Sequence, residues 1–211
     1  MATKPHLPAI FLPFPQGALC ARPEVDDETS MTSFLAINDP ESRMFLSAQN
    51  QPQSAASQRD WWTKPAKDDD IQLFLWYDNR YIGGMGVHNI SYIHGTATTG
   101  TFIWLPEYRN RGIATMAKLV LLDHLFNTLN LRIVYSHVIG YNARSARYSD
   151  KCGYTEIARF PKRFRFGDVL VDEVVLQVTR ESWLPYFTDF QKKHCDADGA
   201  YLTRRELLEK K

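Results

Sequence analysis

The sequence predicts an α/β (α+β) domain in which a mixed, strongly twisted and mostly antiparallel sheet of about six to seven strands is flanked by helices. Two apolar segments, residues 71–77 and 81–90, are joined by the polar residues 78–80, a connection typical of a β-hairpin. From Ile113 onward the hydrophobic period changes from about two to about 3.6 residues, which indicates a helix. Later segments alternate between strand and helix patterns and end in a second hairpin.

The first third of the chain predicts one strand followed by helices. Residues 1–17 are rich in proline and predict an irregular arm, with a short strand after it at residues 18–24. The acidic residues 26–28 are signals for the start of a helix. Shorter helices are expected at residues 39–46 and 57–64.

The remaining elements follow in a regular order. A third strand is expected at residues 98–105, a buried strand at 131–138 and a helix at 143–152. Residues 154–166 and 169–179 predict a hairpin that turns at a Gly-Asp pair. The helix between the third strand and the buried strand has one mainly apolar stripe: Ile113, Met116, Ala117, Val120, Leu121, His124 and Leu125.

Length predicts one domain with two appendages. The 211 residues are enough to bury the core of a single domain. We expect an N-terminal arm at residues 1–17, the main domain at 18–183, and a helical C-terminal extension at 184–211 in two pieces broken near residues 196–199.

Composition argues against several classes of protein. The formal net charge is +1, so no strong field attracts nucleic acid or anionic lipid. Cys20, Cys152 and Cys195 are far apart and form no C-x-x-C pair, so we expect reduced thiols and no metal site. No apolar run approaches the ~20 residues of a membrane span. The sequence therefore predicts a cytoplasmic protein.

The most informative segment lies between the third strand and the long helix. A basic turn containing Arg109, Arg111 and Gly112 ends where the helix begins. The first turn of a helix leaves several N–H groups unpaired and carries about half a positive charge, so a diphosphate can bind there without a metal. Taken alone, the segment is equally compatible with an ordinary turn whose arginines are solvated.

A second segment makes the pattern more specific. Asn142 and Ser145 open a later helix, and Gly153 followed by Tyr154 ends it. The two segments together resemble the GNAT superfamily of acetyl-coenzyme A-dependent N-acetyltransferases, which pairs an R/Q-x-x-G-x-G/A turn with a later N-x-x-S and G-Y/F. The resemblance covers about residues 18–183 and is nearest to the branch containing ribosomal-protein N-terminal acetyltransferases.

This resemblance implies where the coenzyme binds. The strands at residues 98–105 and 131–138 would splay apart and admit the acetyl-pantetheine arm. Backbone groups of the first strand would contact the pantetheine, the turn and first helical residues would hold the pyrophosphate, and the second motif would face the other side. The implied acetyl-CoA site comprises Phe102, Ile103, Trp104, Arg109, Asn110, Arg111, Gly112, Ile113, Ala114, Thr115, Asn142 and Ser145. Asn110 departs from the family pattern, which often has glycine there.

Acetyl transfer to an amine needs a group that accepts the amine proton. His137 lies five residues before Asn142, where some N-terminal acetyltransferases that this chain resembles have a glutamate base, and imidazole titrates in a useful range. The alternative is a hydrogen-bonded histidine with only a structural role. Glu107, at the end of the preceding strand, is the competing base, acting through water.

The departing thiolate needs a proton donor. Ser145 matches a serine that has this role in ribosomal-protein acetyltransferases, although it is also explained as a helix-start hydroxyl. Tyr148 and Ser149 flank the position where other members have tyrosine. Asp172 and Glu173 either place negative charge near a cationic amine or are simply solvated.

The leading hypothesis is an acetyl-CoA-dependent N-acetyltransferase that acts on a protein N-terminus or a small primary amine by direct attack on the thioester. The alternatives are an enzyme that uses a longer acyl-CoA as donor, admitted by a wider gap beside Trp104, and a non-catalytic acyl-CoA-binding module.

A basic run at residues 159–165, interleaved with phenylalanines, is a weak argument for nucleic-acid binding. We interpret it as a hairpin with one packed and one solvated face. The acceptor is not encoded in any motif, and a monomer and a homodimer are both compatible with the sequence.

Overall fold

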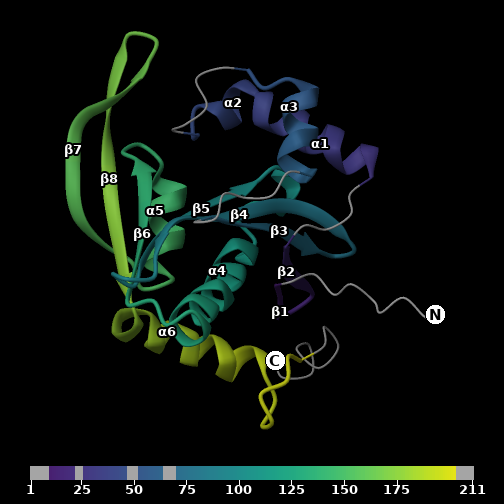
Figure 1. The fold of residues 1–211 in the computed structure, drawn as a ribbon, viewed down its shortest axis with the longest axis vertical. Coiled ribbons are helices and arrows are strands. Elements are labelled where there is room, and N and C mark those ends of the chain that lie inside the picture. The colour runs from purple at the N-terminus through teal and green to yellow at the C-terminus, as the bar shows by residue number, and fades with distance from the viewer. Residues whose placement is uncertain (1–9, 22–25, 47–51, 64–69, 203–211) are drawn as a thin grey trace.

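The computed structural model describes residues 10–21, 26–46, 52–63 and 70–202 (Figure 1). Within them, one eight-stranded sheet has the order β1-β2-β3-β4-β5-β6-β8-β7. Only the β5–β6 pair is parallel. The strands are β1 (Phe11–Phe14), β2 (Gly17–Ala21), β3 (Ile71–Tyr77), β4 (Arg80–Ser91), β5 (Thr96–Ile103), β6 (Ile133–Ile139), β7 (Thr155–Phe166) and β8 (Val169–Thr179). The predicted fold class is confirmed, with slightly more strands than expected.

The additional strand is β1, in the segment predicted to be an irregular arm. It pairs antiparallel with β2, and the Phe14 side chain is only 3% exposed. The prediction was wrong here because it relied on the prolines, yet proline is tolerated in an edge strand such as β1, which contains Pro13. The rest of the arm, residues 1–9, lies outside the described residues.

Helices cover both faces of the sheet. α1 (Asp27–Asn38), α2 (Pro40–Arg43) and α3 (Ala55–Thr63) lie on the opposite side of the sheet from α4 (Ile113–Asp123), as Figure 1 shows. α5 (Ala143–Asp150) packs beside α4, where the Cys152 thiol contacts the Thr115 carbonyl at 3.9 Å. The cleft described below lies between these two helices and β5.

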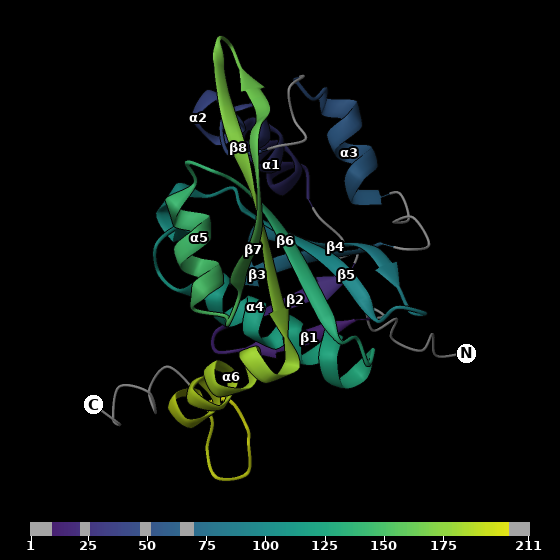
Figure 2. The same cartoon turned by 90° about the vertical axis from the view of Figure 1, so that its left-hand side faces the viewer.

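The core beneath α4 extends into the C-terminal helix α6 (Arg180–His194), which crosses the end of the sheet (Figure 2). Trp183 is 1% exposed, its indole N–H donates to the Leu119 carbonyl at 3.2 Å, and its ring stacks on Phe187 at 4.6 Å. The boundary predicted at residue 183 therefore falls inside a continuous helix. The expected second helical piece falls largely on residues 203–211, outside the described residues.

The two central strands separate as predicted. β5 and β6 pair only at Thr96 with Ile133, Ala97 with Val134 and Thr98 with Tyr135. β5 stays paired with β4 as far as Ile103. The edge of β5 that faces β6 thus has no ladder partner beyond Thr98 in residues 70–202, which are described without a gap.

The β7–β8 hairpin projects beyond the rest of the sheet (Figure 1). A bulge between Phe160 and Phe164 breaks the strand alternation, and Phe160 is 50% exposed. The prediction of one packed and one solvated face is therefore wrong for this part of the hairpin. Arg159 forms ion pairs with Glu156 at 2.9 Å and Asp172 at 3.7 Å, so its charge is partly neutralised.

Candidate active site

The turn before α4 requires an unusual backbone. Asn110 and Gly112 both have positive φ, 61° and 78°. Asparagine is among the non-glycine residues that adopt this conformation most readily, which accounts for Asn110 where the family often has glycine. A Cβ on Gly112 would meet nothing within 4 Å, so glycine is favoured here by its φ angle and not by crowding.

The first turn of α4 is open to a ligand. Gly112 is the N-cap residue, and no side chain of residues 70–202 forms a capping hydrogen bond there. The amide of Met116 donates to the Gly112 carbonyl at 3.0 Å, as the first bond of the helix. The amides of Ile113, Ala114 and Thr115 precede that bond and have no partner within the helix. Together with the helix dipole, they form an anion-binding surface.

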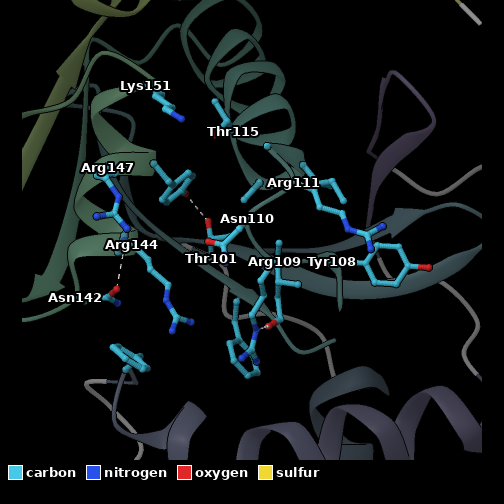
Figure 3. Close-up of a pocket in the computed structure, with 18 of the residues that line it drawn as sticks. Thr101, Tyr108, Arg109, Asn110, Arg111, Thr115, Asn142, Arg144, Arg147 and Lys151 are labelled. Atoms are coloured by element: carbon cyan, nitrogen blue, oxygen red, sulfur yellow. Dashed lines mark hydrogen bonds between the residues drawn. The ribbon is translucent and has the colours of Figure 1, made fainter. Parts of the chain in front are cut away.

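A cleft of about 300 Å³ collects the residues of both motifs (Figure 3). It reaches from α4 and α5 to the region of α2, through the part of the sheet where β5 and β6 separate. The cleft is lined by Ser42, Phe45, Thr101, Phe102, Ile103, Tyr108, Arg109, Asn110, Arg111, Gly112, Ile113, Ala114, Thr115, Asn142, Arg144, Ser145, Arg147, Tyr148 and Lys151. The structure thus brings together every residue of the implied acetyl-CoA site except Trp104.

Trp104 lies behind the cleft wall. Its side chain is 3% exposed, its amide donates to the Ile82 carbonyl at 3.0 Å, and its indole N–H donates to the Tyr81 carbonyl at 3.2 Å. These contacts anchor the end of β5 to the neighbouring strand.

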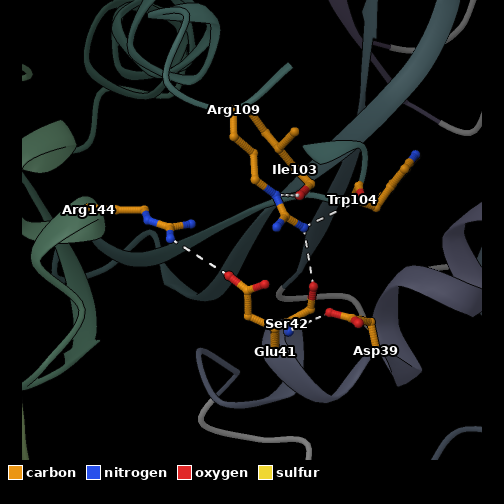
Figure 4. A network of polar contacts seen from close by, with 7 residues as sticks. All are labelled: Asp39, Glu41, Ser42, Ile103, Trp104, Arg109 and Arg144. Atoms are coloured by element: carbon orange, nitrogen blue, oxygen red, sulfur yellow. Dashed lines mark hydrogen bonds and ion pairs between the residues drawn. The ribbon is translucent and has the colours of Figure 1, made fainter. Parts of the chain in front are cut away.

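Arg109 joins the sheet to α2 (Figure 4). Its Nε donates to the Ile103 carbonyl at 3.0 Å and its Nη2 to the Ser42 hydroxyl at 3.2 Å. Ser42 is in turn placed by Asp39, whose carboxylate accepts from the Ser42 amide at 2.8 Å. The guanidinium therefore positions β5 against α2, while Arg109 lines the cleft.

Cationic side chains of α5 face α4 across the cleft. In Figure 3, Arg144, Arg147 and Lys151 follow one another along this helix, opposite Thr115. Arg144 lies over the Phe45 ring at 5.7 Å and forms a 3.7 Å ion pair with a glutamate of α2. Arg147 and Lys151 have no ion pair among the described residues. Because the lining contains arginine and lysine but no aspartate or glutamate, the cleft favours an anion.

Tyr148 extends from α5 to β5. Its hydroxyl is 2.7 Å from the Thr101 hydroxyl, and Lys118 Nζ lies over its ring at 5.9 Å. Burial raises the pKa of Tyr148 well above its usual value, so the hydroxyl keeps its proton at neutral pH. Ser149, in contrast, is 1% exposed and does not line the cleft, whereas Ser145 does.

Lys118 is a buried charge beneath this tyrosine. The residue is 1% exposed, and burial lowers its pKa to about 8. The neighbouring Cys152 thiol is also buried, which raises its pKa to about 12. In the core behind Tyr148, a lysine that loses its proton more readily than usual therefore lies near a protonated thiol.

His137 lies on β6, two residues beyond the last residue that pairs with β5. Its Nδ1 is 2.9 Å from Glu173 Oε1 on β8. Glu107 lies in the exposed 3-10 turn Pro106–Tyr108. Neither His137 nor Glu107 lines the cleft, but His137 is at the gap between the strands.

Three aromatic rings form a chain of contacts that begins at Phe45 in the cleft wall. Phe45, Tyr141 and Phe166 come from the end of α2, the turn before α5 and the tip of β7. Their rings meet edge to face at 5.7 and 5.8 Å, and the Tyr141 hydroxyl donates to the Met44 carbonyl. Segments far apart in the sequence therefore build this chain of contacts.

Comparisons with known proteins agree with this geometry. The family model of the acetyltransferase (GNAT) domain matches residues 19–155. The chain belongs to the GNAT acetyltransferase family. YdaF of Bacillus subtilis (strain 168), a protein provisionally named as a ribosomal N-acetyltransferase, is 24% identical over 166 residues, which cover 76% of this chain and 90% of YdaF. The predicted family is confirmed by the family model.

Two further relatives of this GNAT protein are named for a polyamine. Spermidine N(1)-acetyltransferase of Vibrio cholerae is 32% identical over 92 residues, 42% of this chain, and the match spans about half (53%) of that relative. A solved structure of spermidine N-acetyltransferase from Vibrio cholerae with CoA and spermine shares the fold, with a TM-score of 0.68, 20% identity, and coverage of 80% of this chain and 98% of that one. The GNAT protein is thus a member of a family of N-acetyltransferases.

Sequence reasoning missed part of the GNAT protein's cleft. Arg144, Arg147 and Lys151 have spacings of three and four residues, so a helical projection of the predicted helix would have placed them on one face. Ser42 and Phe45 had no such signal, because only the tertiary fold brings them to the cleft. Within the described residues, no cluster of three or more His, Cys, Asp or Glu side chains is arranged for a metal, and no helix is long and apolar enough to cross a membrane.

Proposed function

We propose that this GNAT protein transfers the acetyl group of acetyl-CoA to a primary amine by direct attack on the thioester. The observation that carries the proposal is the cationic cleft, which begins at the uncapped first turn of α4 and continues to the gap between β5 and β6. The names of the relatives support two acceptor classes, a protein N-terminus and a small polyamine. A cytoplasmic location stays a prediction.

The cleft fits the chemical groups of acetyl-CoA. The amides of Ile113, Ala114 and Thr115 are suited to the pyrophosphate. Arg147 and Lys151, which have no ion pair among the described residues, add positive charge on the opposite wall. The unpaired edge of β5 offers backbone hydrogen bonds to the amides of the pantetheine arm.

The proposed reaction uses one base and one acid. The amine nitrogen forms a bond to the thioester carbonyl carbon while its proton passes to His137 Nε2, directly or through one water. The C–S bond breaks, and the Tyr148 hydroxyl gives its proton to the departing sulfur. Exchange with water then moves the proton from His137 back to Tyr148. Tyr148 starts this step protonated, because burial raises its pKa well above its usual value.

The alternative of a non-catalytic module has little support in the geometry. It would be favoured if Asn110 and the absence of tyrosine from its usual position in the family reflected a lost active site. Asn110 adopts the required backbone conformation, and Tyr148 lines the cleft with its hydroxyl near Thr101.

The test is a direct assay of the purified protein. Acetyl-CoA is incubated with N-terminal peptides, spermidine and simple amines while release of free thiol is followed, with acceptor-free reactions as controls. We expect thiol release that depends on an amine, with the acetylated product identified by mass spectrometry. Binding of acetyl-CoA without transfer to any amine would favour the non-catalytic module, and faster turnover of longer acyl-CoA would identify a different acyltransferase.

A further inference from the structure

Three strands contribute to one polar chain beside the gap in the sheet. Glu173 of β8 contacts His137 Nδ1 of β6 at 2.9 Å through one carboxylate oxygen and Arg163 Nε of β7 at 3.5 Å through the other. The Glu173 side chain is 12% exposed, whereas those of His137 and Arg163 are 41% and 66% exposed. The carboxylate is therefore the most enclosed member, held between two partners.

The sheet register explains this meeting. Ile139 pairs with Glu173 and His137 with Val175, so His137 and Glu173 are diagonal neighbours on the same face of two adjacent strands. Val134 and Val138 point to the other face of the sheet, where they pack in the core with α4. The imidazole thus lies on the side of the sheet away from α4.

The bulge in β7 places the third member. Phe160 pairs with Glu173 and Phe164 with Val171, so the intervening residues are looped out of the ladder. Lys162 has φ 56° at the bulge. The bulge that interrupts the alternation predicted for β7 therefore brings Arg163 to the Glu173 carboxylate.

We propose that Glu173 is a positioning residue for acetyl transfer, fixing His137 with its proton on Nδ1 and its Nε2 free to accept the proton of the amine. The proposal rests on the proposed function and adds a residue to its machinery. A carboxylate accepts hydrogen bonds and donates none, so the ring nitrogen facing Glu173 must be the protonated one. The other nitrogen is then an acceptor, as a general base requires.

The same contact stabilises the product of proton transfer. When His137 Nε2 gains a proton, the imidazolium forms 2.9 Å from a carboxylate that is largely shielded from solvent. The positive charge of Arg163 weakens this stabilisation only slightly, because the guanidinium is well exposed and contacts the carboxylate at the longer distance of 3.5 Å. Arg163 also holds the carboxylate oxygen that does not contact His137. The neighbouring Asp172 instead contacts Arg159 and accepts from the Lys162 amide. It therefore provides a matched control on the same strand.

The experiment compares Glu173→Gln with Asp172→Asn in the full-length protein. We expect Glu173→Gln to lower kcat roughly 10- to 100-fold, because an amide offers an N–H as well as a carbonyl and no longer fixes the tautomer. The KM for acetyl-CoA should stay within about twofold, since Glu173 is outside the cleft. Asp172→Asn should leave kcat unchanged.

Two further measurements separate positioning from folding. Glu173→Asp keeps a carboxylate, which accepts hydrogen bonds and donates none, so it should restore part of the rate. Nitrogen NMR of the His137 ring should show Nδ1 protonated in the wild type and a mixture of tautomers in Glu173→Gln. Unchanged kcat and tautomer in Glu173→Gln, with His137→Ala slowed, would overturn the positioning role alone; so would an equal loss in Asp172→Asn. A wild-type protein that acetylates no amine would overturn the proposed function itself.

Discussion

The two halves of the proposed site are built in different ways. The half proposed for the coenzyme is made of short contiguous segments, the turn before α4 and the start of α5, and it offers backbone amides and cationic side chains. The half proposed for the acceptor is made of distant segments, including the end of α2, the turn before α5 and the tip of β7, which meet through Phe45, Tyr141 and Phe166. A local motif was therefore enough to indicate the first half, whereas the second depends on how the loops and the hairpin assemble.

Tyr148 stands where the two halves meet, and its removal should have the largest effect. Tyr148→Phe should lower kcat about 100-fold, because the thiolate loses its proton donor, while the Kd of acetyl-CoA stays nearly unchanged. Tyr154→Phe is the matched control: its hydroxyl makes a similar 3.0 Å contact with Thr99, but it does not line the cleft. Steady-state kinetics and calorimetry measure both. Equal losses in the two variants would assign Tyr148 a structural role.

Replacing Lys118 tests whether its buried charge destabilises the folded protein. Its pKa falls from 10.5 to about 8 on folding, so between these pH values the unfolded chain binds more protons and stability contributed by this residue rises with pH. Lys118→Met should therefore add about 3 kcal/mol to the free energy of unfolding at pH 7. The gain should shrink as pH rises from 8 to 10. Denaturant titrations across this range check it, with exposed Lys192→Met as control; a gain independent of pH would contradict the buried-charge explanation.

Gly112 tests the backbone basis of phosphate recognition. Gly112→Val should weaken acetyl-CoA binding about tenfold, because a β-branched residue disfavours φ 78° and distorts the turn that presents the amides. Gly167 has φ 59° and open space at the hairpin tip, so Gly167→Val imposes similar strain away from the cleft. Calorimetric titration with acetyl-CoA compares the two. If both variants bind as the wild type does, the amides of α4 are not the phosphate site.

The cations of α5 should have the smallest effect. Replacing Arg147 and Lys151 with alanine should weaken acetyl-CoA binding about threefold, since exposed charges are screened by solvent and salt. The salt dependence of the Kd should also become shallower. Lys192→Ala, an exposed cation of α6, should change neither quantity. A double variant with unaltered salt dependence would confine phosphate recognition to the backbone of α4.

Much of the fold could be predicted because its signals are local. The change of period at Ile113, the turn at residues 78–80 and the hairpin ending at Thr179 are set by neighbouring residues. The strand β1 could not be predicted, because proline is excluded from a sheet only where its missing N–H is needed, and an edge position is known only after assembly. The bulge at Lys162 could not be predicted for a similar reason, because alternation in the sequence does not show which backbone hydrogen bonds form between neighbouring strands.

The sequence by itself indicated the family, the order of most elements and the candidate coenzyme motifs, because these motifs lie in one turn and at the start of one helix. Only the tertiary structure decided that Arg109 fastens β5 to α2, that Tyr148 and not Ser149 faces the cleft, and that Glu173 meets His137. These contacts join residues from different strands and helices. Their geometry depends on sheet register and helix placement, which side-chain packing sets over the whole domain.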